Sequence, residues 1–148
     1  MAQLKIGLLG GSFNPAHKGH YHISLIALKR LQLDQVWWLV SPQNPLKERT
    51  EMAPLAKRLA GARDMATHPR ILVSNLESKY STRYTVDTLA ALLRRQPNHR
   101  FVWLMGADNL LQLKRWYRWP IIVRTMPIAI FNRPGQGHRA LACTAAIR

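Results

Sequence analysis

The chain has 148 residues, of which 47% are hydrophobic and 20% are charged. This is the composition of a folded globular protein, and the length is enough for one domain with a substantial core. No apolar run approaches the roughly 20 residues that a membrane helix needs, and the short apolar stretch near the N-terminus is not a secretory signal. The single cysteine, Cys143, excludes an internal disulfide. We therefore expect a soluble, cytoplasmic protein of one domain.

The formal net charge of +15 is unusually high and unevenly spread. No acidic residue follows Asp108, whereas these basic residues do: Lys114, Arg115, Arg118, Arg124, Arg133, Arg139 and Arg148. A nucleic-acid-binding surface and a pocket for small polyanions would both use such charge. We favour the second interpretation, because the uneven spread is typical of a chain from which a compensating acidic segment is absent.

Apolar stretches and helical patterns alternate along the chain. Strands are predicted at Leu4–Leu9, Val36–Val40, Ile71–Ser74, Phe101–Met105 and Pro127–Phe131. Helices are predicted at Gly19–Leu31, Leu55–Thr67, Thr85–Arg95 and Asp108–Leu113, with a further turn or helix at Trp119–Arg124. Residues 41–54 are predicted to form a loop. Continuous apolar strands separated by helices predict an α/β fold with a parallel sheet covered on both faces.

The most informative stretch is GGSFNPAHKGH, residues 10–20, between the first predicted strand and the first predicted helix. It predicts a glycine turn followed by His17 and His20, which lie three residues apart and so project together from the first helical turn. A helix N-terminus favours an anion, and two imidazoles add hydrogen-bond donors. Gly19 would let a phosphate approach the backbone closely. The stretch therefore predicts a phosphate site, although it matches neither the dinucleotide-binding nor the P-loop pattern.

Three informative stretches follow predicted strands. Residues 10–20 follow the first strand, residues 41–47 follow the second, and residues 106–109 follow the fourth. Ligands of parallel α/β sheets bind outside the carboxyl ends of the strands. We therefore expect one crevice to collect all three stretches.

The pattern Gly-Gly-Ser-Phe-Asn-Pro-x-His-x-Gly-His resembles the signature of the nucleotidylyltransferase superfamily, whose members join a nucleoside triphosphate to a phosphorylated partner and release pyrophosphate. Three later segments are similar to those of the bacterial nicotinate-nucleotide adenylyltransferase family: Ser41–Lys47, Thr82–Leu89, and Met105–Asn109 together with Trp116. The resemblance covers Leu4 to about Gly135. It implies a Rossmann-like parallel sheet of the nucleotidylyltransferase type.

The resemblance implies that ATP and nicotinate mononucleotide are the substrates. Mg²⁺ would bridge phosphate oxygens without a dedicated protein metal site. His17 and His20 are the implied catalytic residues, which hold the ATP phosphates and the pentacoordinate phosphorus and can ionise once phosphate charge is close. The other implied ATP-binding residues are Gly10, Gly11, Ser12, Phe13, Gly19, Gly106 and Asp108.

The implied acceptor-binding residues are Asn14, Asn44, Lys47, Tyr84, Thr85 and Trp116. The backbone N–H groups of Tyr84 and Thr85 are implied to bind the nicotinate carboxylate, which suits a helix N-terminus, and Trp116 to stack on the pyridine ring. Plainer interpretations stay open at three positions. Thr85 could cap its helix, Lys47 could be a solvated loop residue, and Asp108, implied to contact the ribose, could be a first-turn acid.

The family continues past the end of this chain with a further Ser/Thr-x-Ile-Arg phosphate motif. Residues 142–148 match it weakly, because Cys143 and Ala145 lack the required hydroxyls. We therefore expect the chain to lack its C-terminal part. Two alternatives to the nicotinate enzyme remain: an adenylyltransferase for nicotinamide mononucleotide or phosphopantetheine, and a basic nucleic-acid-binding module without catalysis. The oligomeric state stays open, a homo-oligomer included.

Overall fold

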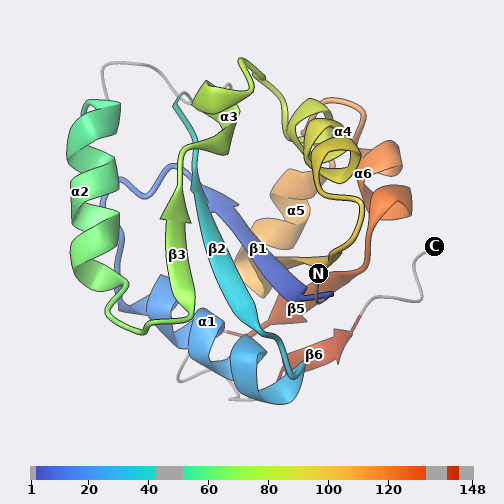
Figure 1. Cartoon of the computed structure of the whole chain (residues 1–148), viewed down its shortest axis with the longest axis horizontal. Helices are drawn as coiled ribbons and strands as arrows, with labels where there is room; N and C mark the ends of the chain where they lie inside the picture. The colour runs from blue at the N-terminus through green and yellow to red at the C-terminus, as the bar shows by residue number, and fades with distance from the viewer. Residues whose placement is uncertain (1–2, 43–51, 133–139, 144–148) are drawn as a thin grey trace.

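The structure, a computed structural model, describes residues 3–42, 52–132 and 140–143. A six-stranded sheet in the order β3-β2-β1-β4-β5-β6 forms its centre (Figure 1). The strands are β1 (Lys5–Gly11), β2 (Gln35–Val40), β3 (Ile71–Ser74), β4 (Arg100–Gly106), β5 (Ile128–Phe131) and β6 (Ala140–Cys143). The first five run parallel, which confirms the predicted α/β fold with a Rossmann-like parallel sheet.

Helices cover both faces of the sheet, as predicted. They are α1 (Lys18–Arg30), α2 (Leu55–Met65), α3 (Leu76–Lys79), α4 (Thr85–Arg95), the 3-10 turn η2 (Ala107–Asn109), α5 (Leu110–Leu113) and α6 (Trp119–Thr125). The buried residues of α1 and α2 belong to one hydrophobic cluster, and those of α3, α4, α5 and α6 belong to another. The sheet therefore separates two layers of helices.

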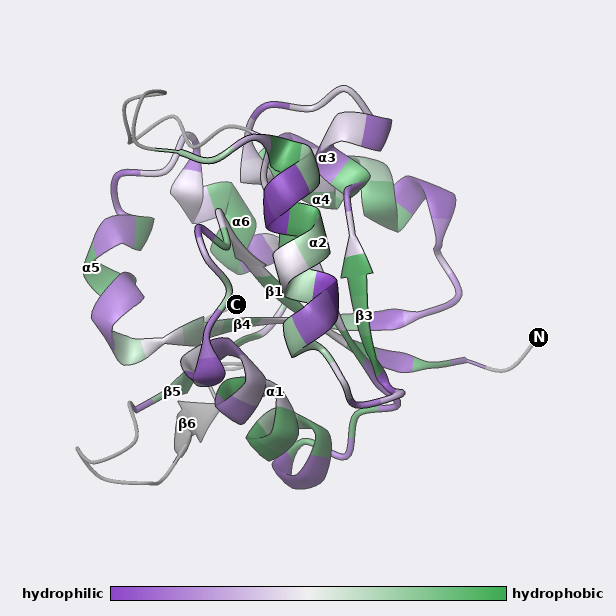
Figure 2. Ribbon diagram, turned by 90° about the vertical axis from the view of Figure 1, so that its left-hand side faces the viewer, coloured by the Kyte–Doolittle hydropathy of each residue, from purple (hydrophilic) through white to green (hydrophobic). Residues whose placement is uncertain are grey.

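Strand side chains alternate between these two clusters because successive residues of a strand point to opposite faces. Trp103 and Met105 of β4 lie in the cluster on the α4 side, whereas Leu104 lies in the cluster on the α1 side. In Figure 2 the central strands are coloured largely as hydrophobic residues, and many of the surrounding loops as hydrophilic residues. No helix in the described part of the chain is long and apolar enough to cross a membrane.

The parallel sheet has its switch point at β1, which pairs with β2 on one side and β4 on the other. The crossover reverses direction here, so the loops after β1 and β4 diverge and leave room for a ligand at the carboxyl ends of the strands. In Figure 1 the arrowheads of β1 and β3 mark this end of the sheet. The predicted phosphate stretch follows β1 directly.

Two elements were missed by the sequence predictions. β6 pairs antiparallel with β5, so Pro127–Phe131 is not the last strand of the sheet. Its sequence, Ala-Leu-Ala-Cys, is too short to show a strand pattern. The single turn of α3 is likewise too short for helical periodicity to appear.

The predicted glycine turn was wrong in its position. Gly10 and Gly11 belong to β1 and pair with Leu39 and Val40 of β2, so the turn begins only at Ser12. A Cβ atom on Gly10 would lie 2.5 Å from Cη2 of Trp103, whereas one on Gly11 would meet only ordinary contacts. Gly10 is therefore required by the Trp103 ring on the neighbouring strand.

Two glycine substitutions should have opposite effects on stability. Gly10→Ala should lower the free energy of unfolding by about 1–3 kcal/mol, because its Cβ overlaps the buried Trp103 ring. Gly61→Ala, in the middle of α2 with nothing within 4 Å of the new Cβ, should raise it by about 0.5–1 kcal/mol. Urea unfolding of both variants measures the difference. Adding Trp103→Phe should restore part of the loss in Gly10→Ala; equal stability of Gly10→Ala and the parent would contradict this packing.

Candidate active site at the carboxyl ends of β1 and β4

The side chains of His17 and His20 both accept backbone hydrogen bonds at the start of α1. The Nδ1 atom of His17 accepts a hydrogen bond from the Gly19 N–H at 3.0 Å, and Nδ1 of His20 accepts one from the His17 N–H at 3.1 Å. Together these bonds form a capping box in which two imidazoles take the places usually held by a hydroxyl and a carboxamide or carboxylate. Helix α1 begins at Lys18, one residue before the predicted start at Gly19.

The two caps determine the tautomer of each neutral histidine. Because Nδ1 accepts a backbone hydrogen bond, the proton of the neutral ring is on Nε2. The two ring centroids are 3.9 Å apart, so two Nε2–H donors lie side by side at the end of β1. A Cβ atom on Gly19 would come within 2.8 Å of the His17 ring. Gly19 is thus needed to seat the His17 cap, a role that the sequence analysis had not assigned to it.

The His20 ring is held by an aromatic stack. It packs on Phe13 at 4.3 Å, and Phe13 packs on the buried Trp38 at 5.2 Å. The Trp38 indole donates to Ser24 Oγ, and the Ser24 hydroxyl donates to the His20 carbonyl. Phe13 has a φ of 50°, which is an unfavourable backbone conformation for a large side chain. Phe13 is nevertheless almost fully buried, with 1% of its surface exposed.

Burial and the nearby His17 lower the pKa of His20 from its ordinary 6.5 to about 4. The ring is therefore neutral at pH 7 in the free protein. This low pKa makes the expected ionisation of His20 near phosphate harder than the sequence suggests, because the sequence does not reveal how much water the Phe13–Trp38 stack removes from the imidazole.

Asp108 lies across the switch point from the histidines, in η2 after β4. A Cβ atom placed on Gly106 would lie 2.6 Å from Oδ1 of Asp108 and 3.8 Å from the Ile23 side chain of α1. The Asp108 carboxylate therefore folds back over the end of β4, toward the first turns of α1. The structure thus brings Gly106 and Asp108 to the same side of the sheet end as α1.

Two of the predicted acceptor residues, Tyr84 and Thr85, lie at the start of α4. Tyr84 is the N-cap residue, and no side chain in the described part of the chain caps this helix, so the alternative that Thr85 caps it was wrong. The Tyr84 ring lies 4.6 Å from the Tyr117 ring, and the adjacent Trp116 packs edge-on against Trp103 at 5.9 Å. The segment before α4 is thereby joined to the α5–α6 connection.

Asn14 joins the β1–α1 loop to the start of α2, because its Oδ1 accepts the Ala53 N–H at 3.1 Å. Asn44 and Lys47 lie outside the described residues. Among the residues that the structure describes, no three histidine, cysteine or acidic side chains are placed to hold a metal ion.

Two buried charged residues beside the site were missed. The Arg58 side chain, 4% exposed, and the Glu77 carboxyl, 8% exposed, both hydrogen-bond to Ser41 at the end of β2. Arg58 could have been noticed from the sequence, because it lies on the apolar side of the predicted helix with Leu55 and Leu59. Glu77 gives no such signal, because α3 has no periodic pattern.

Burial raises the pKa of Glu77 to about 7, although the hydrogen bond from the Ser41 hydroxyl at 3.1 Å opposes the shift. Burial lowers the pKa of Arg58, but an arginine starts so high that it stays charged. The end of β2 is therefore held by a buried cation and by a carboxyl group that is partly protonated near neutral pH.

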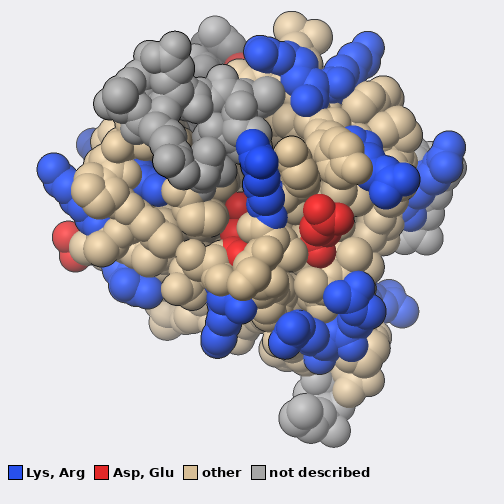
Figure 3. Space-filling model, turned by 90° about the horizontal axis from the view of Figure 1, so that it is seen from above, with Lys and Arg blue, Asp and Glu red and all other residues tan. Residues whose placement is uncertain are grey.

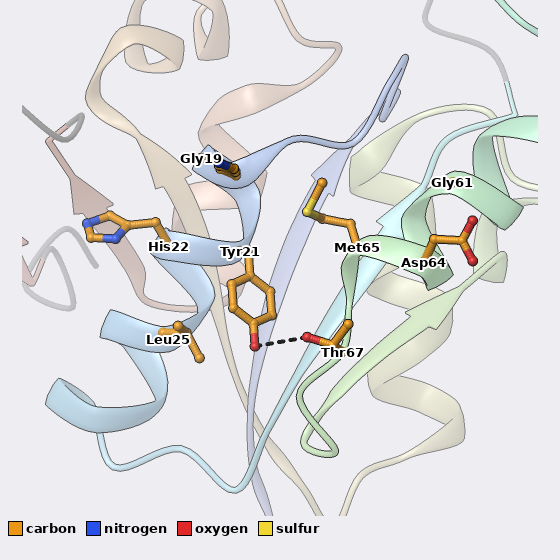
Figure 4. Close-up of a pocket in the computed structure, with 9 residues that line it drawn as sticks. Gly19, Tyr21, His22, Leu25, Gly61, Asp64, Met65 and Thr67 are labelled. Carbon is orange, nitrogen blue, oxygen red and sulfur yellow. Dashed lines mark hydrogen bonds between the residues drawn. The ribbon is translucent and has the colours of Figure 1, made fainter.

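A separate groove runs between α1 and α2 (Figure 4). The Thr67 hydroxyl hydrogen-bonds to the Tyr21 hydroxyl at 3.2 Å and joins its two walls. Of the predicted site residues only Gly19 lines this groove, and neither His17 nor His20 does. The groove is therefore distinct from the site at the strand ends.

Lysine and arginine side chains surround the end of the molecule at which the parallel strands finish (Figure 3). Fewer acidic side chains are visible on this face, near its middle and at its left edge. Together with the net charge of +15, this distribution of charge favours the approach of a polyanion such as a nucleoside triphosphate.

A parallel sheet with a switch point at β1 and paired histidines at the following helix start define a nucleotidyltransferase type of nucleotide-binding protein. The model of the cytidylyltransferase-like family matches residues 8–148. A protein of Parvibaculum lavamentivorans named probable nicotinate-nucleotide adenylyltransferase is 61% identical over 143 residues, which are 97% of this chain and 71% of that protein. One of the same name from Cereibacter sphaeroides is 59% identical over 95% of this chain and 76% of its own length. The chain therefore belongs to the cytidylyltransferase-like family and, within it, to the nicotinate-nucleotide adenylyltransferases.

A solved structure supports the fold independently. Plasmodium falciparum nicotinic acid mononucleotide adenylyltransferase, complexed with NaAD, superposes with a TM-score of 0.78 over 93% of this chain and 68% of its own. The sequence identity is 18%, so this likeness concerns the fold alone.

The neutral state of His20 can be tested by nitrogen NMR. In the free protein His20 should carry its proton on Nε2 and titrate near pH 4. Because this pKa lies below the ordinary 6.5, the group adds stability above pH 6.5 that is lost as pH falls toward 4. His17→Asn keeps a capping acceptor but removes the neighbouring imidazole, so the pKa of His20 should rise. Titration of His20 at its ordinary pKa would contradict the desolvated arrangement.

Glu77→Gln should change how stability depends on pH. The raised pKa means that the parent is most stable when Glu77 is protonated, below pH 4.5, and loses stability as pH rises through about 7. A shift of this size corresponds to roughly 3 kcal/mol. Relative to the parent, Glu77→Gln should therefore gain up to about that amount between pH 4.5 and pH 8. Chemical unfolding at both pH values, with exposed Asp64→Asn as the control, measures it; parallel pH profiles for Glu77→Gln and the parent would rule it out.

Proposed function

We propose that the chain transfers the adenylyl group of ATP to nicotinate mononucleotide and so produces deamido-NAD and pyrophosphate for NAD biosynthesis. The observation that carries the proposal is the pair of Nε2–H donors, His17 and His20, at the β1 switch point. The identity of 61% to a protein named for this reaction supports the choice of substrates.

The reaction requires no covalent nucleophile on the protein. A phosphate oxygen of the acceptor attacks the α-phosphorus of ATP in line, the bond from that phosphorus to the β-phosphate bridging oxygen breaks, and pyrophosphate leaves with its electron pair. The protein must hold the two substrates in line and stabilise charge on the phosphorus oxygens and the leaving group. In the proposal His17 and His20 donate from Nε2 to those oxygens, and ATP enters as its magnesium complex, with Mg²⁺ held by the phosphates.

The start of α4 suits the acceptor's carboxylate. No side chain of a described residue caps this helix, so its first N–H groups can bind an anion. A neutral carboxamide would gain less from this helix start than a carboxylate does. The rings of Tyr84 and Tyr117 lie together at this helix start and can contact a pyridine, and Trp116 precedes Tyr117 in the chain. This arrangement favours nicotinate over nicotinamide mononucleotide within the proposal.

A pyrophosphate-release assay tests the function directly. With ATP and Mg²⁺, the protein should release pyrophosphate when nicotinate mononucleotide is the acceptor. Its kcat/KM should be at least roughly tenfold above that for nicotinamide mononucleotide, because a hydrogen bond to a charged group contributes enough binding free energy for more than a tenfold change. Mass spectrometry should identify deamido-NAD. In the same assay His20→Ala should lower kcat by on the order of 10²–10³-fold while KM for nicotinate mononucleotide changes little.

The alternatives predict other results. Turnover only with nicotinamide mononucleotide or phosphopantetheine would change the acceptor. Salt-dependent oligonucleotide binding that ATP does not displace, without any pyrophosphate release, would favour a nucleic-acid-binding module. Unchanged kcat in His20→Ala would remove His20 from the mechanism.

A further inference from the structure

The buried side chain of Arg58 binds four backbone carbonyls from separate parts of the chain. Nε donates to Ala53 at 2.7 Å, Nη1 donates to Ser12 at 2.8 Å and to Ser41 at 2.6 Å, and Nη2 donates to Pro42 at 3.0 Å. These five residues are called the Arg58 clamp below. No carboxylate among the described residues makes an ion pair with Arg58, and within this part of the chain the hydrogen-bond partners of the buried charge are the four carbonyl groups.

The clamp joins the loop after β1 to the end of β2. Ser12 lies between β1 and the histidines, and Ser41 and Pro42 follow β2 directly. The Ser41 N–H also donates to the Gly11 carbonyl at 2.9 Å, so the clamp begins where the regular pairing of β1 with β2 ends. Beyond this point no strand pairing among the described residues holds the loop after β1 against the residues after β2. The hydrogen bonds of Arg58 hold them together instead.

Ala53 is held from two sides. Its carbonyl accepts from Arg58 Nε, and its N–H donates to Oδ1 of Asn14 in the β1–α1 loop. The approach to α2 is therefore attached to the same loop that carries His17 and His20. A small movement of Arg58 would change the position of Ser12, Ser41 and Ala53 together.

We propose that Arg58 is a positioning residue for adenylyl transfer: the clamp sets the loop that carries the histidines against the end of β2 and the approach to α2. The inference rests on the proposed function, because its effect on turnover requires two substrates to be aligned. Alignment of reacting atoms is sensitive to displacements of about 1 Å, which can cost on the order of 10²-fold in rate.

Arginine is needed because of its planar fork. Its nitrogens reach four acceptors in fixed directions, whereas the ammonium of lysine is a compact group with three donors that cannot span them. Arg58→Lys keeps the charge and most of the side-chain volume but loses this geometry. Arg63, exposed on the same helix, gives a matched control because it makes none of the hydrogen bonds of the clamp.

Steady-state kinetics of Arg58→Lys and Arg63→Lys test the proposal. Arg58→Lys should lower kcat by on the order of 10²-fold with less than about a fivefold change in either KM, whereas Arg63→Lys should stay within about twofold of the parent. Both variants are made in the Gly61→Ala background, which is expected to offset lost stability, and are assayed well below their unfolding temperatures. Parental kcat in a folded Arg58→Lys protein would overturn the proposal.

Chemical rescue separates positioning from general stabilisation. Guanidinium ion at millimolar concentration, far below denaturing levels, should raise the kcat of Arg58→Ala at least roughly tenfold. Ammonium ion should not, because only guanidinium reproduces the planar set of donors. Equal rescue by both ions, or recovery with a stabilising osmolyte alone, would show that Arg58 contributes only to stability.

Hydrogen exchange gives a readout that does not depend on activity. In Arg58→Lys the amides of Ser41 and Ala53 should exchange roughly tenfold faster than in the parent, while those of central β4 are unchanged. If the parent protein makes no deamido-NAD but this exchange increases, the proposed reaction fails and the clamp stands. If the parent is active and neither exchange nor kcat changes in Arg58→Lys, the clamp fails and the reaction stands.

Discussion

The mutual capping of His17 and His20 is the interaction on which the site depends. Each imidazole uses Nδ1 to accept a backbone N–H at the start of α1, so each can offer only Nε2–H outward. The bonds hold the rings in fixed orientation without a carboxylate behind them. The same geometry requires Gly19, because any larger residue would meet the His17 ring. Helix capping and ligand binding are thus performed by the same side chains.

The end of β2 shows how the fold stabilises charge away from water. Ser41 hydrogen-bonds to buried Arg58 through its carbonyl and to buried Glu77 through its hydroxyl. Burying an unpaired charge is costly, and carbonyl dipoles compensate it only when the geometry is good. The four short contacts of Arg58 meet that condition, whereas Glu77 accommodates burial by holding its proton to higher pH. Arg58 and Glu77 therefore compensate the loss of water in different ways, although both hydrogen-bond to Ser41.

The parallel sheet and its main helices could be predicted because their signals are local. Helix α4, for example, is found where it was predicted, at Thr85–Arg95, because its apolar spacing and polar flanks agree. The phosphate stretch was also recognised, but its physical details were not. The strand position of Gly10 depends on Trp103, more than ninety residues later, and the low pKa of His20 depends on packing with Phe13 and Trp38. Such contacts between distant segments leave no pattern in a single sequence.

A neutral His20 limits how the proposed reaction can be stabilised. To become an imidazolium, the ring must place a proton on Nδ1, which would break its hydrogen bond with the His17 N–H at the start of α1. Desolvation by the Phe13 stack opposes the same change. Bound phosphate favours the charged ring, but it must overcome both effects. In the proposed mechanism His20 therefore acts as an oriented neutral donor, whose bond shortens as charge grows on the phosphate oxygens. The long-range attraction of ATP then comes from the lysines and arginines around the site, so that substrate capture and transition-state stabilisation are assigned to different side chains.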